Sequence, residues 1–132
     1  MRISKNRSQP AQPGVEDYFQ LAHEVVDITE RTRNGTASLD DFRGGTFTIT
    51  SVGNIGGRFA TPIINHPEVA ILGIHKMEAR AVVRDGQVVP RQMMNISLSF
   101  DHRLIDGHEG AEFAQRIKGY LEDPELMMLE MS

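Results

Sequence analysis

EVAILGIHKMEARAVVRDGQVVPRQMMNISLSF, residues 68–100, is the stretch that decides the fold. Apolar and β-branched residues dominate both halves, and Asp85-Gly86 between them is a dipeptide typical of a tight hairpin turn. In the second half, apolar side chains alternate with polar ones, at Met94, Ile96, Leu98 and Phe100. This period of two is typical of a half-buried strand. We therefore predict two long antiparallel strands joined at Asp85-Gly86.

Helices and one further strand are expected on either side of this hairpin. Residues 15–33 carry apolar side chains at helical spacing, and a second run of this kind follows Gly107. TFTITS, residues 46–51, alternates Phe47 and Ile49 with threonines, which predicts a half-buried strand. The expected fold class is α/β (α+β), a sheet with helices.

The composition restricts the classes of protein to which this chain can belong. With 132 residues, of which 39% are hydrophobic and 24% charged, the chain fits one globular domain. The net charge of −4 and the lack of a Lys/Arg cluster give no reason to expect nucleic acid or a membrane surface as a partner. The longest apolar run, VAILGI at residues 69–74, is too short to span a bilayer. The sequence contains no cysteine, so no disulfide is expected.

Residues 1–14, MRISKNRSQPAQPG, are expected to be a tail or linker, because they are rich in proline, glycine and polar residues without periodicity. The basic start leads into polar residues rather than an apolar core, so no secretion signal is recognised. A cytoplasmic location, or the mitochondrial matrix in a eukaryote, is expected.

SLSFDHRLIDGHEG, residues 97–110, places His102 where the second long strand ends. An imidazole can accept a proton near neutral pH and return it, so His102 is a candidate general base. By spacing alone, however, a structural residue in a charged turn is the commoner case. His102, Asp106 and His108 could also bind a metal, but neither H-E-x-x-H spacing nor cysteine accompanies them, and no metal is expected. The other histidines are expected to be solvent-facing or at the core edge: His23, His66 and His75.

SVGNIGGRF, residues 51–59, has three glycines within five residues. Such a loop lets the backbone approach a ligand or another chain closely, but a tight turn needs the same residues. It is not a G-x-G-x-x-G loop between a strand and a helix, which excludes the dinucleotide-binding interpretation. Ser51 follows a strand without a G-x-S-x-G elbow, so a serine hydrolase is not expected either.

The motif FDHRLIDG, residues 100–107, resembles the D-H-R-x-x-D-G signature of the dihydrolipoamide acyltransferases, the E2 components of 2-oxo acid dehydrogenase complexes. The resemblance continues in order through LDDFRGGTFTITSVGNIGG, TPIINHPEVAILGIHK, RQMMNISLSFDHR and YLEDPELMMLE, and covers about residues 15 to 131. Related condensation domains often carry H-H-x-x-x-D-G, and Asp101 in place of the first histidine argues against them.

The resemblance implies a fold similar to that of chloramphenicol acetyltransferase, in trimers with active sites between subunits and higher cubic or dodecahedral cores. It implies acyl transfer between dihydrolipoamide and coenzyme A, with His102 as general base and Thr50 as the oxyanion donor from the neighbouring subunit. Asp106 would hold the histidine loop through Arg103 or a backbone donor, and Asp101 and Arg103 would give structural support. The expected substrate-binding residues follow the strand: Ser51, Gly53, Asn54 and Gly56.

The family's catalytic domain is considerably longer than this chain, so we expect an N-terminally truncated, C-terminal part of the domain at residues 15–132. The lipoyl domain and the segments that bind the E1 and E3 components are expected to lie outside it. A sheet lacking its neighbours exposes edges and apolar faces, which predicts oligomerisation. A core-forming fragment without activity is therefore the alternative to an acyltransferase. The loop and the tail favour a pyruvate or branched-chain complex.

Overall fold

The computed structural model describes residues 15–130, without the side chains of residues 15–18 and Asn54. The predicted tail at residues 1–14 lies outside the described residues. The elements follow in the order α1 (Val15–Arg33), β1 (Thr48–Ser51), β2 (Ala70–Arg84), β3 (Gln87–Phe100), α2 (Gly107–Glu122) and α3 (Pro124–Glu130). Two 3-10 turns, η1 (Leu39–Phe42) and η2 (Gly53–Ile55), flank β1. The helices predicted at residues 15–33 and after Gly107 are confirmed.

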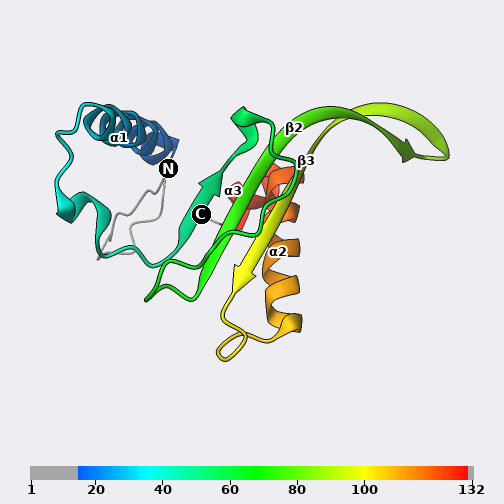
Figure 1. Cartoon of the computed structure of the whole chain (residues 1–132). Coiled ribbons are helices and arrows are strands. Elements are labelled where there is room, and N and C mark those ends of the chain that lie inside the picture. The colour runs from blue at the N-terminus through cyan, green and yellow to red at the C-terminus, as the bar shows by residue number, and fades with distance from the viewer. Residues whose placement is uncertain (1–14, 131–132) are drawn as a thin grey trace.

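The three strands form one mixed sheet in the order β1-β2-β3 (Figure 1). Strand β1 runs parallel to β2, with Thr50 opposite Gly73, and β2 runs antiparallel to β3. At the hairpin, Asp85 and Gly86 have φ values of 51° and 76°, as a two-residue type I′ turn requires. The prediction of two long strands joined at this dipeptide is confirmed.

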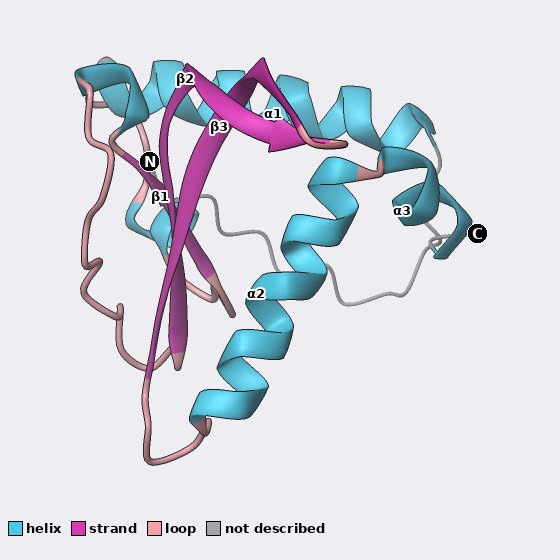
Figure 2. Cartoon of the chain, turned by 90° about the vertical axis from the view of Figure 1, so that its right-hand side faces the viewer, coloured by secondary structure: helices cyan, strands magenta, loops and turns pink. Residues whose placement is uncertain are grey.

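Helix α2 covers one face of the sheet and lies along β3 (Figure 2). Phe113 of α2 meets Phe47 edge-on, with the ring centroids 5.7 Å apart. Gly110, in the second turn of α2, lies directly against the ring of Phe100. The face that carries Leu98 and Phe100 is therefore the one that packs on the helix.

Residues 58–68, between η2 and β2, cover the opposite face of the sheet, and we call them the covering segment. Asn95 donates through Nδ2 to the carbonyl of Arg58 over 3.0 Å, and Ser97 donates through Oγ to the carbonyl of Ala60 over 2.9 Å. These bonds tie the irregular segment to the sheet face because two of its carbonyls accept hydrogen bonds from side chains of β3.

Strand β1 differs from the prediction in length and in the direction of its side chains. It covers only Thr48–Ser51, and Thr48 is buried whereas Ile49 is 47% exposed. Thr48 faces the covering segment, where its hydroxyl donates to the buried carboxylate of Glu68. Ile49 faces the other side, and α2 packs along β3 rather than over β1. The apolar residue of this strand is therefore the exposed one.

The hydrophobic core of the described residues is small. Its buried apolar side chains are Ile28, Ala70, Ile71 and Leu72. Helix α1 lies to one side of the sheet (Figure 1), and its Phe19 is 67% exposed. Exposed apolar side chains such as Phe19 and Ile49 agree with the expectation that other protein covers them. Within residues 15–130, no helix has the length and apolar character that a membrane span requires.

Candidate active site

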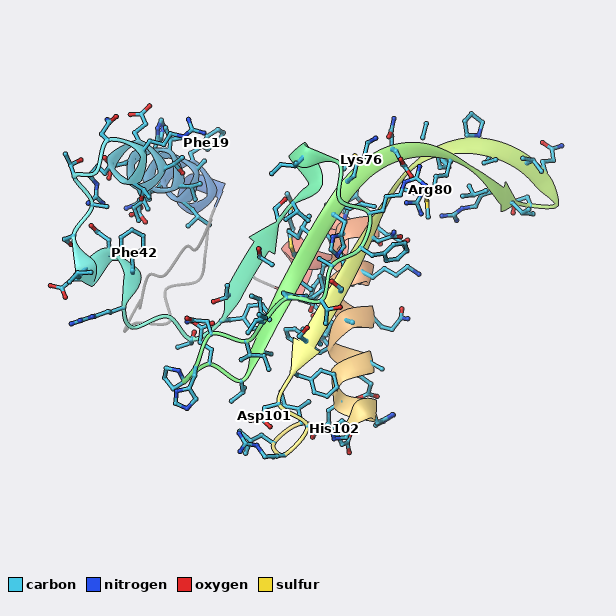
Figure 3. The ribbon with its side chains drawn as sticks, viewed as in Figure 1. Phe19, Phe42, Lys76, Arg80, Asp101 and His102 are labelled. Atoms are coloured by element: carbon cyan, nitrogen blue, oxygen red, sulfur yellow. The ribbon has the colours of Figure 1, made fainter. Side chains whose placement is uncertain are left out.

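His102 lies in a tight turn directly after β3, at the opposite end of the strand from the hairpin (Figure 3). The backbone N–H of Asp101 donates to the carbonyl of Val69 over 2.8 Å, which ties the turn to the start of β2. The N–H groups of Leu104 and Ile105 both donate to the carbonyl of Asp101 over 3.0 Å. These bonds fix the backbone on both sides of His102, while its side chain remains exposed.

Asp101 and Arg103 support this turn by pairing with each other. The Arg103 guanidinium donates to both carboxylate oxygens of Asp101, at 2.5 to 3.1 Å, and the Arg103 N–H adds a bond of 3.0 Å. These hydrogen bonds lower the pKa of Asp101 from its ordinary 3.8 to about 2 and raise the pKa of Arg103. Asp101 is therefore a carboxylate throughout the neutral range.

Asp106 holds the far end of the turn as the N-cap of α2. One carboxylate oxygen accepts the N–H of His108 over 2.8 Å and the N–H of Glu109 over 2.9 Å, in a capping box with Glu109. A backbone donor, one of the two partners expected for Asp106, is thus present. The other expectation, Arg103, is wrong, because Arg103 pairs with the nearer carboxylate of Asp101.

The His102 imidazole makes an aromatic contact with the ring of Phe100. The ring centroids are 5.7 Å apart, and the ring planes are inclined at 42°. Within residues 15–130, no group forms a hydrogen bond with either ring nitrogen. His108, the other histidine of the motif, lies 3.4 Å from Glu112 on α2. No group of three metal-ligating side chains was found among the described residues.

Thr50 lies in β1 on the sheet face that the covering segment packs against. Its backbone pairs with that of Gly73. Its side chain is half-buried, and the hydroxyl has no hydrogen-bonded partner among the described groups. Ser51 points to the other face and is exposed, as strand alternation predicts. Of these two hydroxyls, Thr50 is therefore the one that shares a face with the covering segment.

The glycine-rich loop packs closely against its own chain. A Cβ on Gly53 would lie 2.7 Å from the carbonyl oxygen of His75, and Lys76 donates its N–H to the Gly57 carbonyl over 2.9 Å. Gly56 has a φ of 101°, in the left-handed region that favours glycine. The tight-turn interpretation thus accounts for Gly53 and Gly56. The side chain of Asn54 lies outside the described ones.

His75 is not at the core edge, as expected from the sequence, but buried with 3% of its surface exposed. Its Nε2 lies 2.8 Å from Ser97 Oγ, and Ser97 gives its only proton to Ala60. His75 must therefore donate through Nε2, and its buried Nδ1 has no partner among the described groups. Strand alternation places His75 on the same face as Ile71 and Gly73, but it does not show that the covering segment packs on this face.

Thr50 and His102 are not brought together within one chain. Thr50 is level with Ser97, three residues before the end of β3, and lies two strands away from it. The backbone of Thr50 is therefore about 10 Å from the end of β3 along the strands and about 10 Å across them, and His102 lies two residues beyond that end. A site that uses both side chains must therefore draw them from two chains.

Solved structures of one class share this fold, the catalytic cores of 2-oxo acid dehydrogenase complexes. The dihydrolipoamide acetyltransferase of Azotobacter vinelandii is 44% identical with a TM-score of 0.78, over 83% of this chain and 45% of that chain. The cubic core of a pyruvate dehydrogenase multienzyme complex is 43% identical with a TM-score of 0.78, over 83% and 45% of the two chains.

The chain belongs to the family described as 2-oxoacid dehydrogenases acyltransferase (catalytic domain), whose model matches residues 15–129. The lipoamide acyltransferase component of the branched-chain alpha-keto acid dehydrogenase complex of Pseudomonas putida is 47% identical over 109 residues, which are 83% of this chain. The chain spans about a quarter of the length of that relative and under half of the solved chains. The predicted family and the chloramphenicol acetyltransferase-like fold class are confirmed.

Proposed function

We propose that this chain is part of an acyltransferase that moves an acyl group between dihydrolipoamide and coenzyme A, with His102 as general base and Thr50 as oxyanion donor. The observation that carries the proposal is the exposed imidazole of His102, held on a braced turn in a chain of this family. The named relatives belong to branched-chain and pyruvate complexes, which supports an acyl group from either source.

The spacing of three residues supports these roles. Work on the Azotobacter vinelandii enzyme addresses a serine, a histidine 52 residues further on and an asparagine four residues after that in its catalytic mechanism. In this chain, Thr50, His102 and Asp106 stand at the same intervals. Threonine keeps the hydroxyl of serine, and aspartate keeps the side-chain oxygen that caps α2.

The proposed reaction begins with proton transfer from the thiol of coenzyme A to the imidazole of His102. Thiols and imidazoles ordinarily have pKa values about two units apart, so the transfer costs about 3 kcal/mol. The thiolate then attacks the thioester carbonyl of acyl-dihydrolipoamide and forms a tetrahedral oxyanion, to which Thr50 donates. When the C–S bond to dihydrolipoamide breaks, its sulfur takes the proton back from the imidazolium.

The proposed active site lies between two chains of a trimer, since the sheet register separates Thr50 from His102 in one chain. The large apolar surface supports such an assembly, with Phe19 and Ile49 both exposed. A cubic core, as in the pyruvate dehydrogenase structure, and E1 and E3 components as further partners are part of this proposal. Ser51, Gly53 and Gly56 would line the approach of the substrates, beside Asn54.

The test is acyl transfer between the two thiols in the native assembled protein. His102→Ala is expected to lower kcat by about 10²- to 10⁴-fold, the usual contribution of a general base. His108→Ala is the matched control, because this exposed histidine lies six residues away on α2. Thr50→Val is expected to lower kcat by about 10²- to 10³-fold, whereas Thr50→Ser is expected to retain the rate because it keeps the hydroxyl. Unchanged turnover in His102→Ala would remove the proposed mechanism.

A core-forming chain without activity is the second candidate, and the exposed apolar surface is the observation that favours it. Measurements of particle size and of acyl transfer distinguish the two candidate functions. Large particles in light scattering, without acyl transfer, would support the structural role alone, whereas particles whose transfer depends on His102 support the enzyme. A stable monomer would contradict the structural role.

A further inference from the structure

Phe100 forms a bridge between α2 and the histidine turn. It is the last residue of β3, and its half-buried ring points to the sheet face that α2 covers. A Cβ on Gly110 would lie 2.4 Å from Phe100 Cε1 and 2.8 Å from Cζ. No side chain larger than glycine fits at this point of α2 while the ring keeps its place.

The Phe100 ring also lies beside the His102 imidazole. The two centroids lie 5.7 Å apart, and no described group forms a hydrogen bond with the imidazole. The backbone of the turn is fixed by the bonds of Asp101, Leu104 and Ile105, but these bonds leave the two side-chain torsions of His102 free. The contact with Phe100 is therefore the described interaction that orients the ring.

The backbone conformation at position 110 does not require a glycine. It is buried in the interior of α2, where glycine costs about 1 kcal/mol relative to alanine. Its φ is not among the positive values. The close approach of the Phe100 ring is the feature that requires it.

We propose that Phe100 is a positioning residue for His102, and that Gly110 admits the Phe100 ring to the place from which it orients the imidazole. This inference rests on the proposed function, because the orientation matters only if His102 is the base. A tilted aromatic pair stabilises its geometry modestly, so its loss is expected to lower kcat by about 3- to 10-fold, with KM unchanged.

The experiment measures kcat and KM for acyl transfer in the assembled native protein. Phe100→Leu removes the aromatic contact and keeps an apolar side chain, whereas Phe100→Tyr keeps the ring and is expected to rescue kcat. Phe113→Leu is the matched control, because Phe113 makes a 5.7 Å aromatic contact with Phe47 in the same helix-sheet interface. It is expected to leave kcat unchanged.

A double variant shows whether Phe100 acts through His102. In a His102→Ala background, Phe100→Leu is expected to change the residual rate less than twofold, because no imidazole is left for Phe100 to orient. Should Phe100→Leu fail to assemble, Gly110→Ala provides the second approach, since it displaces the ring without removing it. It is expected to lower kcat by a similar factor.

The inference is overturned if Phe100→Leu and Phe113→Leu have the same kcat, or if Gly110→Ala assembles and retains full kcat. A full loss of kcat in His102→Ala alongside either result leaves the proposed function intact. Normal turnover in His102→Ala would instead overturn the proposed function. The two failures are therefore distinguishable within one set of variants.

Discussion

Replacing Ser97 by alanine removes one hydroxyl that serves two partners. Ser97 Oγ accepts from Nε2 of the buried His75 over 2.8 Å and donates to the Ala60 carbonyl over 2.9 Å. In the variant both ring nitrogens of His75 lack a partner among the described groups, since Nδ1 already has none. An unpaired buried donor costs about 1–3 kcal/mol and a lost hydrogen bond about 1 kcal/mol, so we expect Ser97→Ala to lower the free energy of unfolding by about 2–4 kcal/mol.

The assay is thermal unfolding of the assembled protein, with Ser99→Ala as the control. Ser99 lies two residues further along β3 on the same face and has no hydrogen bond from its side chain among the described groups. For a chain of this length, the expected loss in Ser97→Ala corresponds to a fall in Tm of about 7–14 °C. Equal Tm values for Ser97→Ala and Ser99→Ala would refute the assignment of the His75 hydrogen bond.

Three further outcomes follow from the same contacts. Gly53→Ala should destabilise the fold by about 1–3 kcal/mol in chemical unfolding, because the new Cβ would lie 2.7 Å from the backbone of His75. Asp106→Ala should cost about 1–2 kcal/mol as a lost N-cap, while Asp106→Asn retains most of that stability. The carboxyl carbon shift of Asp101 in NMR should titrate near its pKa of about 2. Since folding lowers this pKa, the stabilisation by Arg103 is complete above pH 4 and disappears as the pH falls through about 2.

The hairpin could be predicted from the sequence because its determinants are local. Asp85-Gly86 supplies the backbone angles of the turn, and the alternation up to Phe100 marks the face that packs on α2. Both signals lie within the elements that they determine. The helix that follows Gly107 was predictable for the same reason.

The direction of β1 and the burial of His75 could not be predicted, because both depend on the covering segment. Thr48 turns inward since Glu68 accepts its hydroxyl, and His75 is buried since Ser97 and the Ala60 carbonyl complete its hydrogen-bond chain. Glu68 is 20 residues from Thr48, and Ser97 and Ala60 are 22 and 15 residues from His75 in the sequence. No periodicity within a strand contains that information.

The candidate site was predictable by resemblance and not by spacing. The motif around His102 is weak alone, and its pairing with Thr50 came from the family. The structure adds the braced turn, the cap by Asp106 and the sheet register that separates Thr50 from His102. Of the two partners expected for Asp106, the backbone donor is present, whereas Arg103 pairs with Asp101, which is only two residues away.

The central proposal is that each active site takes His102 from one chain and Thr50 from another. The most direct test is to co-express His102→Ala and Thr50→Val chains and measure acyl transfer in the mixed assemblies. In randomly mixed trimers, about a quarter of the interfaces pair an intact His102 with an intact Thr50, so we expect about a quarter of the native activity. Mixed assemblies no more active than either variant alone would contradict the two-chain site.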